Sequence, residues 1–245
     1  MKKTIIIIGF LLLCANGIHA QKLKRIVGSG NVVSITRTTD DYDGLDVGGF
    51  FDIELVAGEE GNITLNGEDN ILEQITTEVR NGILTIKPMK NRNLRPSVKS
   101  GVSITIPVEA IDELKISGAG KFVSKKILKA RNLKIRVSGS RNVTLGLESE
   151  SLMLRISGSN NVQLKGTAQD LDVHSSGSSN CRGYELEVDY ASFQMSGSSN
   201  VEITVHESLS ARTSGSSNVR YRGSPSRIQS KTSGSSNVIA VHQEY

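Results

Sequence analysis

The stretch Ser176-Gly177-Ser178-Ser179-Asn180 decides the fold, because close variants of it recur along the C-terminal half of the chain. The repeats are marked by their central glycines, whose successive spacings are 21, 19, 19, 20, 18 and 19 residues. These glycines are Gly118, Gly139, Gly158, Gly177, Gly197, Gly215 and Gly234. A nearly constant spacing is typical of repeat proteins, in which each unit buries its apolar face by stacking on the next.

Apolar and polar residues alternate on both sides of each motif. Upstream, the sixth, fourth and second residues before the glycine are apolar, as in Leu152-Leu154-Ile156. Downstream, the fourth and sixth are apolar, as in Val162-Leu164. A period of two indicates strands with one buried face, and each repeat is expected to supply two short strands separated by the glycine corner. The sequence therefore predicts an all-β fold, a parallel β-helix or β-solenoid with coils of about 19 residues.

The corner residues have separate expected tasks. Glycine takes a positive φ at a sharp bend without steric cost. The asparagine three residues later would form a ladder, its amide bonding to the asparagines above and below or to the turn backbone. We expect a structural turn ladder made of Gly139, Asn142, Gly158, Asn161, Gly177, Asn180, Gly197, Asn200, Gly215, Asn218, Gly234 and Asn237.

The last repeats and one cysteine depart from the pattern. The upstream positions of the final repeat, Ile228, Ser230 and Thr232, are smaller and more polar, which suits the end of a solenoid. Cys181 stands where most repeats have valine. We interpret it as a small buried filler, with a reactive thiol as the alternative.

Residues 21–110 are also rich in predicted strands, but they are less regular. Asn81-Gly82 predicts a type I′ turn in a hairpin over residues 78–86, and residues 101–107 predict a strand ended by Pro107. Residues 69–76 are expected to form one helical turn at most. Residues 87–100 are polar and basic and predict an exposed loop.

The two halves are expected to form one continuous domain over residues 30–245, with the repeat solenoid occupying 111–245. Residues 28–32, Gly-Ser-Gly-Asn-Val, resemble the repeat corner. An early strand is therefore expected to share the coil architecture.

The first 20 residues have the layout of a secretory signal peptide, with two lysines, an apolar run and a small residue at the end. Cleavage is expected after Ala20, which leaves no transmembrane segment in the mature chain; acylation of Cys14 is the alternative. Loss of Lys2 and Lys3 reduces the basic residues from 29 to 27 against 25 acidic ones, so the mature net charge is about +2. Cys181 then remains alone, and no internal disulfide can form.

The sequence does not predict a catalytic, cofactor-binding or metal site. From residue 118 onward the aspartates are Asp170, Asp172 and Asp189. The first two flank an inward leucine and are expected to point outward, which does not define an acid–base pair. The histidines His174, His206 and His242 fall in different coils at unlike positions, so convergent metal ligands are not expected.

Basic residues of the repeats are interpreted as scattered over the outer surface. They include Arg136, Arg155, Arg182, Arg220 and Arg222, and no aromatic residues are interleaved with them. Nucleic acid is therefore not an expected partner.

The repeats, together with residues 44–47, 51–55 and 78–86, resemble the "putative auto-transporter adhesin, head GIN domain" family. This family is found largely in exported proteins of Bacteroidetes-type bacteria. The resemblance covers roughly residues 30–240 and implies a right-handed β-helix-like fold and an adhesive role, but it identifies no ligand and no catalytic residue.

The expected function is that of an exported, non-catalytic, adhesin-like or structural protein of the cell surface or periplasm. Its expected partner is a polysaccharide or a cell-surface protein. A carbohydrate-binding module and a polysaccharide-processing β-helix enzyme are the alternatives. The oligomeric state is left open.

Overall fold

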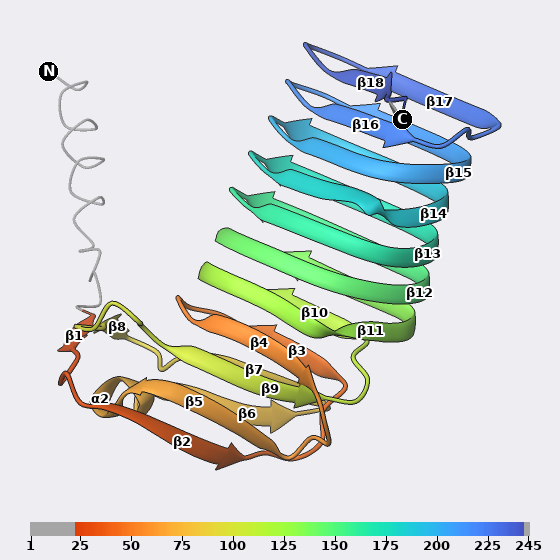
Figure 1. The fold of residues 1–245 in the computed structure, drawn as a ribbon. Helices are drawn as coiled ribbons and strands as arrows, with labels where there is room; N and C mark the ends of the chain where they lie inside the picture. Colours follow the sequence, from red (N-terminus) through yellow and green to blue (C-terminus); the bar gives the residue numbers. More distant parts are fainter. Residues whose placement is uncertain (1–22, 243–245) are drawn as a thin grey trace, which may run out of the picture.

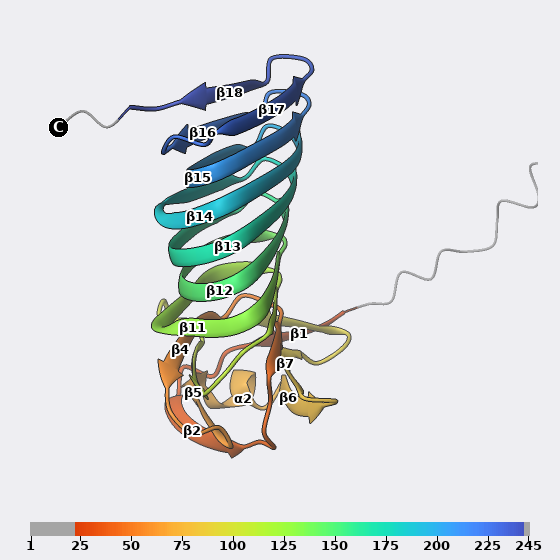
Figure 2. The same ribbon diagram turned by 90° about the vertical axis from the view of Figure 1, so that its right-hand side faces the viewer.

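A computed structural model describes residues 23–242 of the chain, so the predicted signal peptide lies outside the described residues. The protein is a β-solenoid of about seven coils standing on a less regular β-rich base (Figures 1 and 2). The elements of the base are β1 (Lys24–Val27), β2 (Val32–Thr38), β3 (Gly44–Val47), β4 (Asp52–Ala57), β5 (Asn62–Glu68), α2 (Asp69–Leu72), β6 (Ile75–Arg80), β7 (Ile83–Pro88), β8 (Arg92–Arg95), β9 (Ser103–Val108) and β10 (Glu113–Ile116). The coils above it are β11 (Ala119–Val137), β12 (Ser140–Gly158), β13 (Asn161–Gly177), β14 (Asn180–Gly197), β15 (Asn200–Thr213), β16 (Asn218–Arg222), β17 (Arg227–Thr232) and β18 (Asn237–Ala240).

The coils stack in parallel and keep equivalent corner residues in register. Asn142 pairs with Asn161, Asn161 with Asn180, and Asn180 with Asn200. The predicted all-β solenoid is therefore confirmed, with a coil repeat of about 19 residues.

The strands are longer than predicted. From β11 to β15, each strand runs from one glycine corner around the far bend toward the next corner, instead of dividing into two short strands. Backbone pairing continues through the far bend, opposite the corner: β12 and β13 pair from Asn142 with Asn161 to Gly158 with Gly177 without a register shift. Register shifts occur in this stretch, between Gln163 and Lys165 and between Gly183 and Glu187. Differences in repeat length are absorbed there, and the corners stay aligned.

One continuous apolar core runs through base and coils. The inward columns are made of strand residues that are almost completely buried, such as Leu133, Leu152 and Leu171, which are 0–3% exposed. Burial of such columns is the main stabilising contribution, at roughly 25 cal/mol per Å² of apolar surface. The core thins at the last coil, where all six residues of β17 are exposed.

Two of the strands grouped above with the base form the first coil, which therefore precedes the repeat segment. Strand β3 pairs in parallel with β10, and β4 pairs in parallel with β11. Its corner glycine is Gly49, whose carbonyl oxygen lies directly beneath Gly118. The sequence Gly48-Gly49-Phe50 at this corner lacks the serine and asparagine that identify the later repeats.

The strands on either side of residues 28–32 do not share the coil architecture, contrary to the expectation from their sequence. Strand β1 pairs with β8 in a separate two-stranded sheet, and β2 pairs antiparallel with β5. The Glu68 side chain explains the difference, because its carboxylate accepts the Gly30 backbone N–H at 2.7 Å and a Cβ at Gly28 would lie 2.1 Å from it. These glycines therefore wrap a buried carboxylate instead of stacking on another corner.

The other local predictions for the base are mostly confirmed. Asn81 and Gly82 have φ values of 51° and 72° and connect the antiparallel strands β6 and β7. Helix α2 is a single turn. Strand β9 continues one residue past Pro107, to Val108. The predicted loop over residues 87–100 is partly wrong, because it contains β8, whose Leu94 is 7% exposed.

A substitution of a corner glycine tests the stacking directly. Gly177→Ala is expected to lower the free energy of unfolding by about 2–5 kcal/mol, from the positive φ and from overpacking against the coil below. Its φ is 101°, and its added Cβ would lie 2.5 Å from the Gly158 carbonyl oxygen. The matched control is Gly101→Ala, because Gly101 has a φ of 64° but no atom within 4 Å of an added Cβ. Its cost is expected to be about 1–2 kcal/mol. Equal losses in urea unfolding would contradict the stacking argument.

Candidate functional site

The corner brings successive backbones into close contact. At Gly177 the φ is 101°, and the backbone N–H of Ser178 donates to the Gly158 carbonyl oxygen at 2.8 Å. The same bond joins Ser198 to Gly177 at 2.8 Å. Each corner therefore hydrogen-bonds the corner beneath it, and only glycine leaves room for this approach.

The asparagines predicted to form a ladder lie in one column at the surface, where Asn200 and Asn218 are partly buried and the others are exposed. Each Nδ2 donates to the Oδ1 of the asparagine on the preceding coil, so that the bonds all run in the same direction. The distances are 3.0 Å for Asn161 to Asn142, 3.5 Å for Asn180 to Asn161, 3.1 Å for Asn200 to Asn180, 3.0 Å for Asn218 to Asn200 and 3.2 Å for Asn237 to Asn218. The amides therefore satisfy one another.

The variable position of the motif, between serine and asparagine, forms a second, buried column. Sequence reasoning gave this position no role. The Ser179 hydroxyl donates to the Gly158 carbonyl at 3.2 Å and accepts the Asn160 backbone N–H at 3.3 Å. Ser217 is 0% exposed and makes the same kind of bond to the Gly197 carbonyl, at 3.3 Å. The sequence does contain a signal for this column. By the two-residue alternation, the second residue after each corner glycine should point inward, yet from Arg141 onward it is always polar.

Arg141 occupies the lower end of this buried column and is 1% exposed. Its guanidinium donates to the carbonyl oxygens of Phe51 at 2.6 Å, Ser117 at 2.7 Å and Gly49 at 3.1 Å. Burial lowers the pKa of Arg141 to about 10, and the negative charge of Asp52 opposes that shift. The side chain joins the first coil to the repeat coils.

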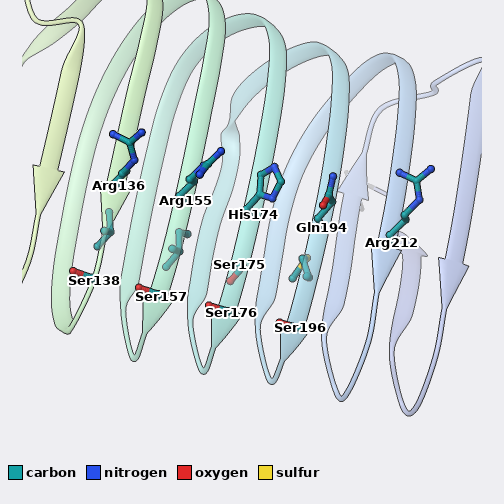
Figure 3. Close-up of a pocket in the computed structure, with 13 residues that line it drawn as sticks. Arg136, Ser138, Arg155, Ser157, His174, Ser175, Ser176, Gln194, Ser196 and Arg212 are labelled. Carbon is teal, nitrogen blue, oxygen red and sulfur yellow. The ribbon is translucent and has the colours of Figure 1, made fainter.

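An open groove of about 850 Å³ lies on the outer face just before the corners (Figure 3). One side is a row of long polar side chains, each three residues before its corner glycine. This row, called here the basic row, consists of Arg136, Arg155, His174, Gln194 and Arg212. Register pairing places each member directly beside the next. The interpretation that Arg136 and Arg155 are scattered is therefore wrong.

The other side of the groove is a row of small hydroxyl side chains, each one residue before its corner glycine. This serine row consists of Ser138, Ser157, Ser176 and Ser196 (Figure 3). Within residues 23–242, these four hydroxyls make no hydrogen bond to another protein group. They are therefore available to a ligand.

Some members of the basic row contact an acidic side chain of the protein, and others do not. Arg136 pairs with Glu113 from β10, and His174 Nε2 lies 3.0 Å from Asp172 Oδ2. Arg155 and Arg212 are exposed, and neither forms an ion pair within the described part of the chain. Two cationic groups in the groove thus have no internal counter-charge.

The groove has the residue types of a catalytic triad, but they do not form its contacts. Asp172, His174 and Ser176 lie at alternate positions of β13, and His174 contacts Asp172. A nucleophilic serine needs a hydrogen bond to its histidine, and none is formed between Ser176 and His174. Between residues 23 and 242, no three His, Cys, Asp or Glu side chains lie close enough to hold a metal ion.

The remaining residues considered from the sequence lie apart from the groove. Asp170 is exposed on β13, and His206 lies 3.4 Å from Glu187 on the neighbouring coil. Cys181 is 5% exposed and pairs in register with Val162 and Val201. None of the helices in the described chain has the length and apolarity that crossing a bilayer requires.

The structure is thus a β-solenoid with an open groove on its outer face. The sequence profile of the family described as "Putative auto-transporter adhesin, head GIN domain" matches residues 41–225, and the chain belongs to this family. The comparison with curated proteins gives no significant match.

Solved structures of similar fold include proteins from Bacteroides fragilis and Parabacteroides distasonis. A putative adhesin from Bacteroides fragilis is 23% identical with a TM-score of 0.76, covering 88% of this chain and 100% of the other. A protein from Parabacteroides distasonis described as a putative lipid binding protein is 23% identical with a TM-score of 0.73, covering 89% of this chain and 100% of the other. A putative adhesin from the same species is 21% identical with a TM-score of 0.71, covering 89% and 100%. At these identities the likeness shows the fold alone.

The asparagine ladder is tested by Asn180→Ala, which removes two ladder bonds. The expected loss is about 1 kcal/mol of unfolding free energy, because each exposed hydrogen bond contributes modestly. Ser178→Ala is the matched control, with an expected change within about 0.5 kcal/mol, since that exposed side chain makes no described hydrogen bond. Thermal unfolding of both variants gives the comparison. If Asn180→Ala weakened ligand binding but left the unfolding free energy unchanged, the structural role of the ladder would be contradicted.

Cys181 is expected to be inert in the folded protein. Burial, aided by the negative charge of Glu202, raises the pKa of its thiol to about 12. The thiolate is the reactive form, so a thiol reagent at about pH 8 should not label residues 21–245 until denaturant is added. Rapid labelling of the native protein would favour the reactive-thiol alternative.

Proposed function

We propose that the chain is an exported, non-catalytic, adhesin-like protein that holds a cell-surface or envelope molecule along the outer face of its solenoid. The observation that carries the proposal is the groove between the basic row and the serine row. The hydroxyl groups of the serine row lie on successive coils, and within residues 23–242 neither they nor the guanidinium groups of Arg155 and Arg212 form a hydrogen bond or an ion pair with another protein group. Membership of a family described as adhesins supports the same function.

The groove is a better binding surface than the asparagine ladder. In the ladder, each amide already bonds to its neighbours, so a ligand would have to displace protein hydrogen bonds. In the groove, the hydroxyls of the serine row and the ends of Arg155 and Arg212 lose only bound water when a ligand arrives. We therefore assign the ladder and its glycines a structural role and the groove the binding role.

Export rests on the sequence of residues 1–20, with its basic start, apolar run and terminal alanine. A mature chain beginning near residue 21 would carry the solenoid into the periplasm or onto the outer surface. Acylation at Cys14 is the alternative, and it would leave a lipid-anchored form. Both routes present the solenoid outside the cytoplasm.

Two measurements on the full chain, produced in a Gram-negative host, test this function. Mass spectrometry of the recovered protein is expected to show an N-terminus at Gln21, or an acylated Cys14 in the lipid-anchored case. The purified protein, labelled with a fluorophore on its lysines, is expected to bind intact bacterial cells or mucin-coated plates saturably and to be displaced by unlabelled protein. An unprocessed cytoplasmic chain, or the absence of saturable binding to either surface, would contradict the proposal.

A further inference from the structure

We propose that the ligand of the groove is an acidic polysaccharide that lies along the solenoid axis. Arg155 and Arg212 would hold its carboxylate or sulfate groups, and the serine row would bind its sugar hydroxyls. This inference rests on the function proposed above and adds the chemical class of the partner.

The direction of the ligand follows from the register of the coils. Members of the basic row pair side by side on neighbouring strands, so the row runs perpendicular to the strands. Adjacent strands are about 4.8 Å apart, which places the backbones of Arg155 and Arg212 roughly 14 Å apart across three strand spacings. His174 and Gln194 lie between them, so a small anion bound at one arginine leaves the other free. An extended polymer that follows the row can contact both.

The charge of the ligand follows from the unpaired arginines. Glu113 pairs with Arg136, and Asp172 contacts His174, whereas Arg155 and Arg212 are exposed without a described acidic partner. Arginine binds carboxylate and sulfate-like groups through paired N–H donors, and such charge-assisted bonds are stronger than neutral ones. The groove is therefore complementary to acidic groups that are spaced along a chain.

The remaining lining favours a glycan over a nucleic acid. His174 and Gln194 separate the two free arginines, so the positive charge is intermittent, whereas a nucleic acid carries a phosphate on every nucleotide. Proteins that bind single strands stack bases on aromatic side chains, and no aromatic residue lines the groove. Rows of serine hydroxyls and one amide instead match a ligand that is rich in hydroxyl groups.

The experiment compares two double variants that remove the same charge from different faces. Arg155→Gln with Arg212→Gln empties the groove of its free cations. Arg182→Gln with Arg220→Gln is the matched control, because these exposed arginines lie five residues after their corner glycines, on the strands that follow the corner. All four side chains are exposed, so both variants should unfold at the wild-type temperature.

Binding is measured by biolayer interferometry to immobilised alginate and chondroitin sulfate, with dextran as a neutral polysaccharide. Vesicles containing phosphatidylglycerol and single-stranded DNA are the other anionic probes. Wild type and the control variant are expected to bind one or both acidic polysaccharides with Kd values within twofold of each other. The groove variant should bind at least about tenfold more weakly, because it loses two charge-assisted contacts. Binding should also weaken as salt rises.

The other outcomes overturn the inference. Equal affinity of the two double variants would remove the groove from binding, and equal binding of dextran would remove the need for acidic groups. Binding only to vesicles or only to DNA would assign the cations to a lipid surface or a nucleic acid. If the groove variant still adheres to cells like wild type, this inference fails while the adhesive function stands. If the wild-type protein adheres to no surface, the proposed adhesive function is itself contradicted, and with it the inference that rests on it.

Discussion

The structure depends on the contact between successive glycine corners. At Gly177 the backbone has a positive φ, and an added Cβ would lie 2.5 Å from the carbonyl oxygen of Gly158 below. The coils can approach this closely only because neither residue has a side chain, and the N–H of Ser178 then reaches that carbonyl. Once the corners are stacked, every residue near them is in register with its equivalents. The asparagine ladder, the buried serine column and the basic row are three consequences of the same alignment.

The far bend accommodates differences in repeat length, which the tightly stacked corner cannot. Repeats of 18 to 21 residues occur in the same stack. Their differences are absorbed where the register shifts, as between Gly183 and Glu187, while Asn180 and Asn200 remain paired at the corner. Side chains near the corner therefore form rows that no register shift interrupts. A regularly spaced ligand would meet equivalent groups on every coil there, and this is where the groove lies.

The solenoid was predictable because the local sequence of each repeat indicates its geometry. The glycine marks the bend, and the alternation of apolar residues such as Leu152 and Leu154 marks the inner face. The first coil was not predictable, because its corner at Gly49 has the glycine but lacks the flanking serine and asparagine. The prediction from Gly28 and Gly30 was wrong for the opposite reason. These glycines have the motif, but they surround the Glu68 carboxylate, a tertiary partner that the local sequence does not reveal. The basic row was missed because its residue types change from coil to coil. It becomes visible only when positions are read across the repeats.

The two exposed rows beside the corner differ in what the fold requires of them. An asparagine in the ladder needs an asparagine on the next coil, since its amide bonds to that neighbour, so the ladder has one residue type throughout. A residue of the basic row points outward from a strand whose backbone bonds are already formed, and the stack places no demand on its chemistry. Arginine, histidine and glutamine all occupy that position without disturbing the register. The fold fixes where those side chains stand and leaves open which groups they carry, so this row is the part of the surface where ligand specificity can be set.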